Sequence, residues 1–405
     1  MTIEQTAPSA DETTLRNQDL KTLTAMLQRQ QVQKADFVAP AATIRAEEGV
    51  IVVKGVEAKL SEDGVTQIDG EYRPTHTFLS GLASKLDVPV GYLKRMHRTR
   101  PDLFDANVNG WLHGRKAKVR QRDGRAELIR EAVPGDDRSF FMRTFRGEEG
   151  PGLGRALLSD KYKRFDNLDA LFATLDGIKE AGVPIEVRGC DLTESRMYVR
   201  IQAEGIQAYA PQLLKDYRSP FTGKTGDENP TVFAGILVSN SEVGAGASTI
   251  TPQLVVQVCD NGMTINMDVV KAIHLGSRMA EGVIDWSDEA REKEIELMRI
   301  KARDAVRTFL NVDYVNRTIA RLEVTAGAPV SGADKVVRAV GKKLAFSEEQ
   351  IEGILDHFIK GGQTTAGGVM QAVTSYAQTI TNADVAAEVE SQGVEAMQLA
   401  AAAAK

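Results

Sequence analysis

The stretch that decides the fold is residues 231–276, TVFAGILVSNSEVGAGASTITPQLVVQVCDNGMTINMDVVKAIHLG. It opens with Val232–Val238, which has no polar residue and is therefore typical of a strand buried on both faces of a sheet. Asn261-Gly262 is the residue pair that a tight type I′ hairpin turn prefers. A turn at this pair would place Val258 opposite Ile265, with apolar residues on one face and polar residues on the other. The stretch predicts an antiparallel sheet at the centre of the protein.

The rest of the chain predicts an α+β protein, with a central, largely antiparallel sheet built from hairpins and a helical C-terminal region. Residues 155–201 predict the order strand, helix, strand, strand. Ser287 is expected to cap a long helix. Ser347–Gln350 has the pattern of a capping box, and the helix that it opens is expected to end at Gly361-Gly362. Further helices are predicted at residues 16–34, 365–380 and 383–403.

A chain of 405 residues exceeds the length at which one hydrophobic core usually stops growing, so several domains are expected. The glycine-rich segment Gly147–Gly154 is interpreted as a hinge or domain boundary. The four expected regions are a polar tail with an N-terminal helix (1–40), a small α/β region with a helical hairpin and a basic β-hairpin (41–150), a central α+β sheet domain (151–285) and a helical region (286–405).

The composition is that of a soluble protein, with 42% hydrophobic and 26% charged residues. No apolar run approaches the roughly 20 residues that cross a bilayer, and the first residues do not resemble a secretory signal. Cys190 and Cys259 are the only cysteines, so neither a disulfide framework nor a cysteine-based zinc site is expected. We expect a cytoplasmic protein with reduced cysteines, no membrane contact, and no metal or cofactor.

Positive charge is concentrated in one part of the chain, although the whole chain has a net charge of -6. Residues 94–146 contain 14 Lys or Arg and 7 Asp or Glu. Within them, residues 115–130 predict a hairpin with Asp123-Gly124 as its turn. Its first strand would place four cations on one face, where a phosphate backbone could lie. These cations are Lys116, Lys118, Arg120 and Arg122.

An exposed strand with partly neutralised charge is the alternative interpretation of this hairpin. Glu127 would lie opposite Arg120, and Glu131 opposite Lys116. Contact with nucleic acid is favoured by the cations that continue the basic segment. These are Arg138, Arg143, Arg146, Arg155, Lys161, Lys163 and Arg164. The aromatic candidates for base stacking are Phe140, Phe141, Phe145, Tyr162 and Phe165.

Residues 78–96, FLSGLASKLDVPVGYLKRM, predict two short helices joined by a tight turn at Asp87-Val88. The second helix would begin near Pro89 and carries Lys94 and Arg95. This arrangement is similar to a helix-turn-helix unit that reads the major groove. A helical hairpin that only supports the fold is the alternative interpretation.

The motifs for catalysis are weak. Gly223-Lys224-Thr225 is the ending of a phosphate-binding P-loop, but Arg218 stands where that motif needs glycine. The best set for acid–base catalysis is His274 with Glu242 or Asp260, and a lone histidine after a strand is more often structural. No catalytic residue is predicted, and an uncharacterised enzyme is kept as an alternative.

Three short motifs recur as a set in a known family. They are Arg155–Ser159 followed by Tyr162, Cys259–Gly262 followed by His274, and Ala372–Thr374 followed by Tyr376. With these motifs the chain resembles the phage/plasmid-like proteins, a family named only as a domain of unknown function, and in particular its actinobacterial and actinophage branch. The resemblance implies an origin in a mobile element, and it implies no catalytic residues.

These observations leave three functions open. The first is a nucleic-acid-binding protein of a phage or prophage that acts in replication or recombination, for example in single-strand annealing. Its partners would be single- or double-stranded DNA and further copies of the chain in a homo-oligomer. The second is a self-assembling or host-interaction protein that does not bind nucleic acid, and the third is the uncharacterised enzyme.

Overall fold

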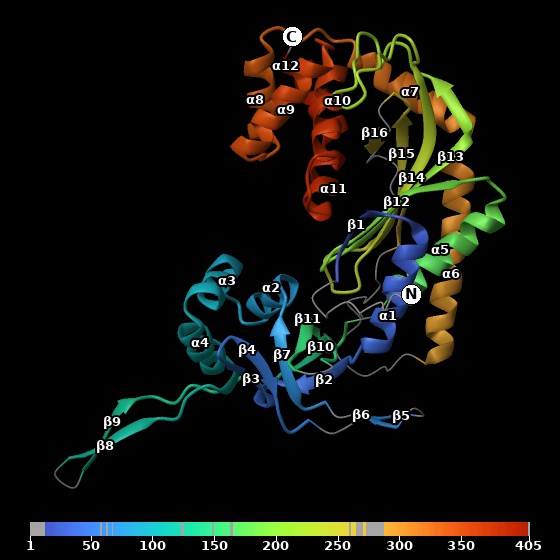
Figure 1. Ribbon diagram of the computed structural model, residues 1–405. Helices are drawn as coiled ribbons and strands as arrows, with labels where there is room; N and C mark the ends of the chain where they lie inside the picture. Colours follow the sequence, from blue (N-terminus) through green and yellow to red (C-terminus); the bar gives the residue numbers. More distant parts are fainter. Residues whose placement is uncertain are drawn as a thin grey trace, which may run out of the picture.

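The computed structural model shows an α+β protein with two sheets and a helical C-terminal region (Figure 1). Each sheet has its own cluster of buried hydrophobic side chains. Within the residues described, no helix combines the length and the apolar character needed to cross a membrane. The described residues are 13–403 except 57–58, 62–63, 67, 123–124, 148–149, 163–164, 259–260, 265–269 and 273–286.

The larger sheet has seven strands, and its described pairings are antiparallel. Its order is β1-β12-β13-β14-β15-β16, and β17 also pairs with β15. The strands are β1 Leu15–Gln18, β12 Glu186–Leu192, β13 Met197–Tyr209, β14 Thr231–Asn240, β15 Ser248–Val256, β16 Asn261–Thr264 and β17 Val270–Ala272.

The prediction of a central buried strand is confirmed by β14. It lies between β13 and β15; Val232, Ile236 and Val238 on one face are almost fully buried, and Phe233 and Leu237 on the other face are half-buried. Helices α5 (Asn167–Ala181) and α6 (Asp288–Phe309) lie on one side of the sheet, and α10 to α12 lie on the other (Figure 1). A strand covered on both faces needs apolar side chains on both, which explains the run without a polar residue.

The hairpin after β15 turns before Asn261-Gly262, so the predicted turn position is wrong. Asn261 pairs with Val256, which makes residues 257–260 the connection and places Asn261-Gly262 in strand β16. Ile265, the predicted partner of Val258, lies outside the described residues. Val258 is buried in the hydrophobic core of the larger sheet. Burial of this side chain, rather than the preference of an Asn-Gly pair, therefore sets the register.

The smaller sheet has six strands in the order β2-β10-β11-β7-β4-β3. It is a mixed, curled sheet, because β11 runs parallel to β7 while its other pairings are antiparallel. The predicted hinge segment Gly147–Gly154 lies at the connection from β10 to β11 within this sheet, and its last three residues belong to β11. The strands are β2 Phe37–Pro40, β3 Ile44–Glu47, β4 Val50–Val53, β7 Gly70–Pro74, β10 Ser139–Phe145 and β11 Gly152–Ser159, and a separate hairpin is formed by β5 Lys59–Ser61 and β6 Gly64–Thr66.

Three helices cover the smaller sheet, and the first two are the predicted helical hairpin. They are α2 (His76–Lys85), α3 (Val90–Thr99) and α4 (Pro101–His113). Asp87 adopts a left-handed conformation with φ of 54° between α2 and α3, which makes the tight turn. Leu93 and Met96 of α3 are buried, so the helical hairpin belongs to the core of the smaller sheet.

The C-terminal helices largely follow the prediction. Ser287 caps α6, and the capping box at Ser347 opens α9, which ends at Gly362 in the left-handed conformation. The predicted helix 383–403 is instead two helices, which are separated by Gln392. A Cβ added to Gly393 at the start of the second helix would lie 2.8 Å from Thr374 Cγ2, so the two helices α12 and α10 approach closely there. The helices are α7 Val312–Ala326, α8 Ala333–Lys343, α9 Glu348–Gly361, α10 Ala366–Ala377, α11 Ala383–Ser391 and α12 Gly393–Ala403.

The N-terminal helix α1 spans Leu20–Gln33 and begins later than predicted. Arg16 lies in strand β1 instead, where its guanidinium pairs with the buried Asp191 at 2.9 Å. Asp19 then caps α1 by accepting a hydrogen bond from Thr22. This ion pair to a buried carboxylate holds an edge strand on the larger sheet, which the pattern of apolar residues does not indicate.

Candidate nucleic-acid interface

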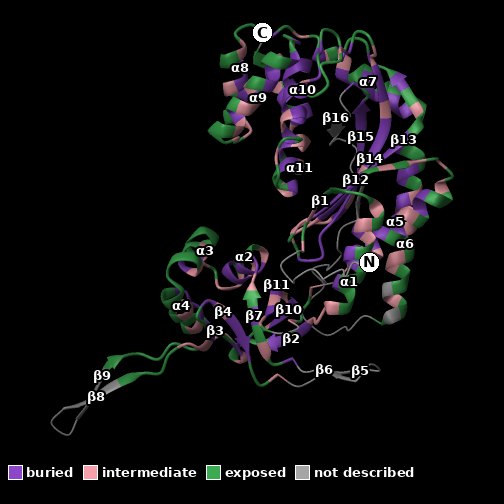
Figure 2. Ribbon diagram, in the orientation of Figure 1, coloured by how far each residue is buried: buried purple, intermediate pink, exposed green. Residues whose placement is uncertain are grey.

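The predicted basic hairpin is a two-stranded arm that projects from the smaller-sheet half of the molecule (Figure 1). We define the arm as residues 115–133. It contains β8 (Lys118–Arg122) and β9 (Arg125–Arg130), which pair with each other and with no other described strand. Figure 2 colours the described residues near the base of the arm, 115–118 and 129–133, as exposed, whereas the strands of both sheets are mostly buried. Neither hydrophobic cluster includes a described residue of the arm.

The root of the arm is held firmly by backbone contacts. Arg115 and Val133 exchange two backbone hydrogen bonds of 2.9 Å. Gly114 has a φ of +65°, and a Cβ added there would lie 2.2 Å from the carbonyl oxygen of Val133. A Cβ on Gly135 would lie 2.8 Å from the carbonyl oxygen of Leu112. These close approaches fix the two strands to the end of α4 and set the direction in which the arm points.

The register of the arm confirms one predicted pair and corrects the other. Arg120 lies opposite Glu127, as predicted. An irregularity at Lys118 then shifts the pairing, so that Lys118 lies opposite Arg130. Lys116 is consequently not opposite Glu131, because the strands continue in the shifted register to the bridge between Arg115 and Val133.

Cross-strand partners share a face of a ribbon, so the register separates the arm into two faces. One face is charged at every paired position and contains five cations and one carboxylate. The other face carries no charge at its paired positions. The residues of the charged face are Lys118, Arg120, Arg122, Arg125, Glu127 and Arg130, and those of the uncharged face are Val119, Gln121, Ala126 and Leu128.

Like charges lie directly opposite each other at two positions of the charged face. Lys118 faces Arg130, and Arg122 faces Arg125. Such pairs destabilise a ribbon that stands alone in water. Lys116, Lys118 and Arg130 are exposed, and none of them forms an ion pair with a described residue. The register therefore places like charges across from each other at two positions of the arm, and Lys116, Lys118 and Arg130 are open to solvent.

Helix α3 presents a second exposed surface in the same half of the molecule. Arg95 is exposed and Lys94 is half-buried, so both predicted cations lie at the surface. Tyr92 is 52% exposed on α3, and Trp111 is 37% exposed on α4. These two aromatic residues were not among the predicted stacking candidates. The sequence could have revealed them, because each directly precedes a leucine that the helix buries, Leu93 or Leu112. Consecutive residues of a helix point in different directions, so the residue before a buried one tends to face solvent.

The other aromatic residues and cations of the predicted basic track are less accessible. Phe140, Phe141 and Phe145 are buried, so the prediction that they stack on bases is wrong. Arg143 and Arg155 are also buried and face ionic partners inside the protein. The predicted track toward Arg164 is interrupted at these two positions, and Arg164 itself lies outside the described residues.

The buried arginines form an ionic cluster between the smaller sheet and the larger sheet with its helices. The Arg143 guanidinium donates from Nε to Asp36 at 3.0 Å and from Nη2 to Asp166 at 2.6 Å. Its Nη1 donates to the backbone oxygen of Glu242 at 2.6 Å. Arg155 pairs with the Glu242 carboxylate, which also accepts from the backbone N–H of Asn167, and Lys34 pairs with Asp166. The cluster connects β10 of the smaller sheet with the start of α5 and the end of β14.

The carboxylates of this cluster are held in the charged form. Burial alone would raise the pKa of Asp166, but Arg143 and Lys34 outweigh burial and hold that pKa well below its ordinary value. Burial likewise opposes ionisation of Glu242, while Arg155 and Arg143 hold its pKa below the ordinary value. Both carboxylates therefore serve as fixed counter-charges at neutral pH.

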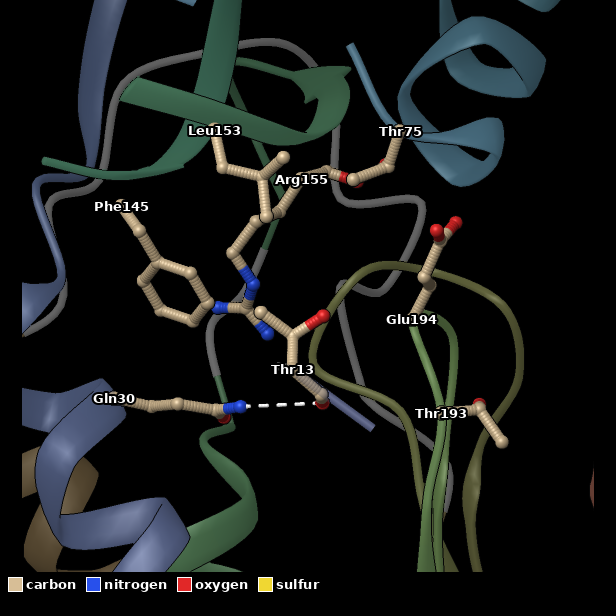
Figure 3. Close-up of a pocket in the computed structure, with 8 residues that line it drawn as sticks. All are labelled: Thr13, Gln30, Thr75, Phe145, Leu153, Arg155, Thr193 and Glu194. Atoms are coloured by element: carbon tan, nitrogen blue, oxygen red, sulfur yellow. Dashed lines mark hydrogen bonds between the residues drawn. The ribbon is translucent and has the colours of Figure 1, made fainter. Parts of the chain in front are cut away.

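A small pocket lies next to this cluster and combines residues from both halves (Figure 3). The Arg155 guanidinium lies 4.1 Å from the ring centre of Phe145. Gln30 donates to the backbone oxygen of Thr13 at 3.5 Å. Arg155 Nη1 and Gln30 Oε1 are buried without a described hydrogen-bond partner. One donor and one acceptor are the partners that a bridging water requires. The remaining lining residues are Thr75, Leu153, Thr193 and Glu194.

The predicted acid–base set is not assembled in the described part of the chain. His274 and Asp260 lie outside it, and Glu242 is occupied by Arg155 and Asn167. Among the described residues, no group of three His, Cys, Asp or Glu side chains is placed to hold a metal ion.

Comparisons with known proteins identify no relative. No family model matches the chain, and neither a curated protein nor a solved structure is similar to it. The resemblance to phage/plasmid-like proteins therefore stays a prediction, and the arm has to be interpreted from its own geometry.

Proposed function

We propose that this protein binds nucleic acid and that the arm is its main contact. The observation that carries the proposal is the register of the arm, which places cations opposite each other at two positions. Lys118 lies opposite Arg130, and Arg122 lies opposite Arg125, on a ribbon that contributes to neither core. Repulsion between these pairs costs stability in water, and a polyanion laid on the same face would turn it into attraction.

The carboxylates of the arm are too few to neutralise its cations. Residues 115–133 contain seven Lys or Arg and three Asp or Glu. Of the acids, Glu127 lies on the charged face opposite Arg120, and this one carboxylate faces five cations. The excess supports a polyanionic partner over an inert, solvated hairpin.

The test removes four charges from the arm. We expect Lys116→Gln, Lys118→Gln, Arg120→Gln and Arg122→Gln together to weaken binding to DNA at low salt and to flatten its salt dependence. Each lost phosphate contact should lower the slope of log affinity against log salt by about 0.7 to 0.9. The fold should be retained, because the arm contributes to neither core.

A matched control removes four charges at the opposite end of the molecule. Lys215, Arg317, Lys335 and Lys342 are exposed, and α7 and α8, which carry three of them, lie far from the arm (Figure 1). Their change to Gln gives the same net charge and should leave binding nearly intact. Equal losses in both variants would show that only the overall charge matters. Absence of binding by the unmodified protein at low salt would refute the proposal.

The resemblance implies an origin in a mobile element, and a role in replication or recombination, for example in single-strand annealing, is the setting in which we place this binding. The uncharged face of the arm favours a second candidate function, which is assembly with another copy of the chain. Changing Val119 and Leu128 to Lys would place charge on that face. If the face joins copies, light scattering after size exclusion should show a smaller assembly for this variant.

A further inference from the structure

We infer that the ligand of the arm is B-form double-stranded DNA and that the arm enters its major groove. This inference rests on the proposed function and names its substrate class. It replaces single-strand annealing as the preferred mode, because the arm has the shape of a groove-binding element and lacks the residues of a single-strand platform.

The first argument is chemical. Proteins that hold single strands stack the bases on aromatic side chains alongside a basic groove. The arm sequence, RKAKVRQRDGRAELIREAV, contains no aromatic residue. Three of the predicted stacking candidates, Phe140, Phe141 and Phe145, are buried in the body. The charged face of the arm therefore offers phosphate contacts without stacking, which suits a duplex whose bases stay paired.

The second argument is geometric. The major groove of B-form DNA is about 12 Å wide and admits a two-stranded β-ribbon. The arm is such a ribbon, and it pairs with no other described strand along its length. The major groove of an A-form RNA helix is deep and narrow, and side chains do not read it. The shape of the arm therefore favours duplex DNA over duplex RNA.

The third argument concerns length and spacing. Arg115 and Arg122 are separated by about 23 Å at 3.3 Å per residue. That length corresponds to about seven base pairs at about 3.4 Å each. Cations that alternate along β8 recur every ~6.6 Å, which is close to two base-pair steps. Several cations can then meet phosphates at regular intervals, while the clamped root at Gly114 presents the arm in one direction.

A competing single-strand surface exists on the body and has to be part of the test. Tyr92 and Trp111 are exposed aromatic side chains near the cations of α3. If the protein holds single strands, these residues are the ones that would stack on the bases. The variant Tyr92→Ala with Trp111→Ala therefore separates the two modes.

The experiment measures binding of the full chain to a short DNA duplex, to one of its single strands and to the RNA duplex of the same sequence. We expect the DNA duplex to bind about tenfold more tightly than either alternative at moderate salt. The arm variant with four Gln should lose most of this binding, and the Tyr92 and Trp111 variant should keep it. A DNA duplex with bulky sugar groups on cytosine C5, which fill the major groove, should bind poorly.

The outcomes distinguish the failure of the duplex inference from the failure of the proposed nucleic-acid binding. Tighter binding to the single strand, with loss in the Tyr92 and Trp111 variant, would overturn the duplex inference and leave nucleic-acid binding standing. Unchanged binding to the duplex with a filled major groove would overturn the groove assignment. Absence of binding to all three nucleic acids would remove both the inference and the proposed function.

Discussion

Removing Arg143 should destabilise the protein more than almost any other single charge change, because its guanidinium is fully buried among three acidic residues. In Arg143→Met, Asp36 would lose its cation while its side chain stays 2% exposed. Asp166 would keep Lys34, and the Glu242 carboxylate would keep Arg155. One buried carboxylate is thus left without a counter-charge. Breaking a buried ion pair in this way costs about 3–5 kcal/mol.

The assay is urea unfolding at neutral pH, with the exposed pair of Lys360 and Asp356 as the control. Lys360→Met removes an ion pair of similar geometry at the surface, and pairs of that kind contribute about 0.3–0.5 kcal/mol. Arg143→Lys should fall between the two, since an ammonium group keeps the charge but lacks the fork that reaches three partners. A loss below about 1 kcal/mol in Arg143→Met would refute the reasoning, because it would mean that the cluster is hydrated in solution.

The remaining predictions concern the loss of stability at low pH, the reactivity of the Cys190 thiol and the position of the turn after β15. The pKa values of Asp166 and Glu242 in the folded protein lie below their ordinary values. Their contribution to stability is therefore fully present above the unfolded-state pKa values near 4, and it should be lost as the pH falls below those values. Urea midpoints that stay constant from pH 6 to pH 3 would contradict this prediction. Burial raises the pKa of Cys190 to about 11, so a thiol reagent should label it only after unfolding, and rapid labelling of native Cys190 at pH 8 would argue against the buried position. Gly262→Val should cost little, because Gly262 lies in strand β16 opposite Val255, and a large fall in melting temperature would instead support a turn at Asn261-Gly262.

The parts of the fold that depend on local pattern could be predicted from the sequence. The apolar run of β14, the capping box at Ser347 and the alternation along β8 each follow from a few neighbouring residues. The turn after β15 could not be predicted in this way. Burial of Val258 competes with the preference of Asn261-Gly262, and only the packed core decides between them.

The candidate site, too, has parts that the sequence predicts and parts that it does not. The cations of the arm were predictable, since they lie at consecutive alternate positions of one strand. The irregularity at Lys118 was not, because an extra residue in β9 leaves no trace in the alternation of β8. The ionic cluster was also out of reach. Arg143 finds Asp36 and Glu242 at separations of 107 and 99 residues, and each of these residues is ordinary in its local sequence.

The protein places its arginines in two physically different environments, and this difference separates stability from binding. Arg143 is surrounded by carboxylates that are already ionised, so a polyanion outside the protein gains nothing from it. Arg122 lies at the end of a ribbon opposite Arg125, where no described carboxylate is paired with it across the strands. Changes at the cluster should therefore lower the free energy of unfolding without altering the salt dependence of DNA binding. Changes on the arm should do the reverse, because the charge of the arm supports no packed core, while the charge of Arg143 is already balanced by buried carboxylates.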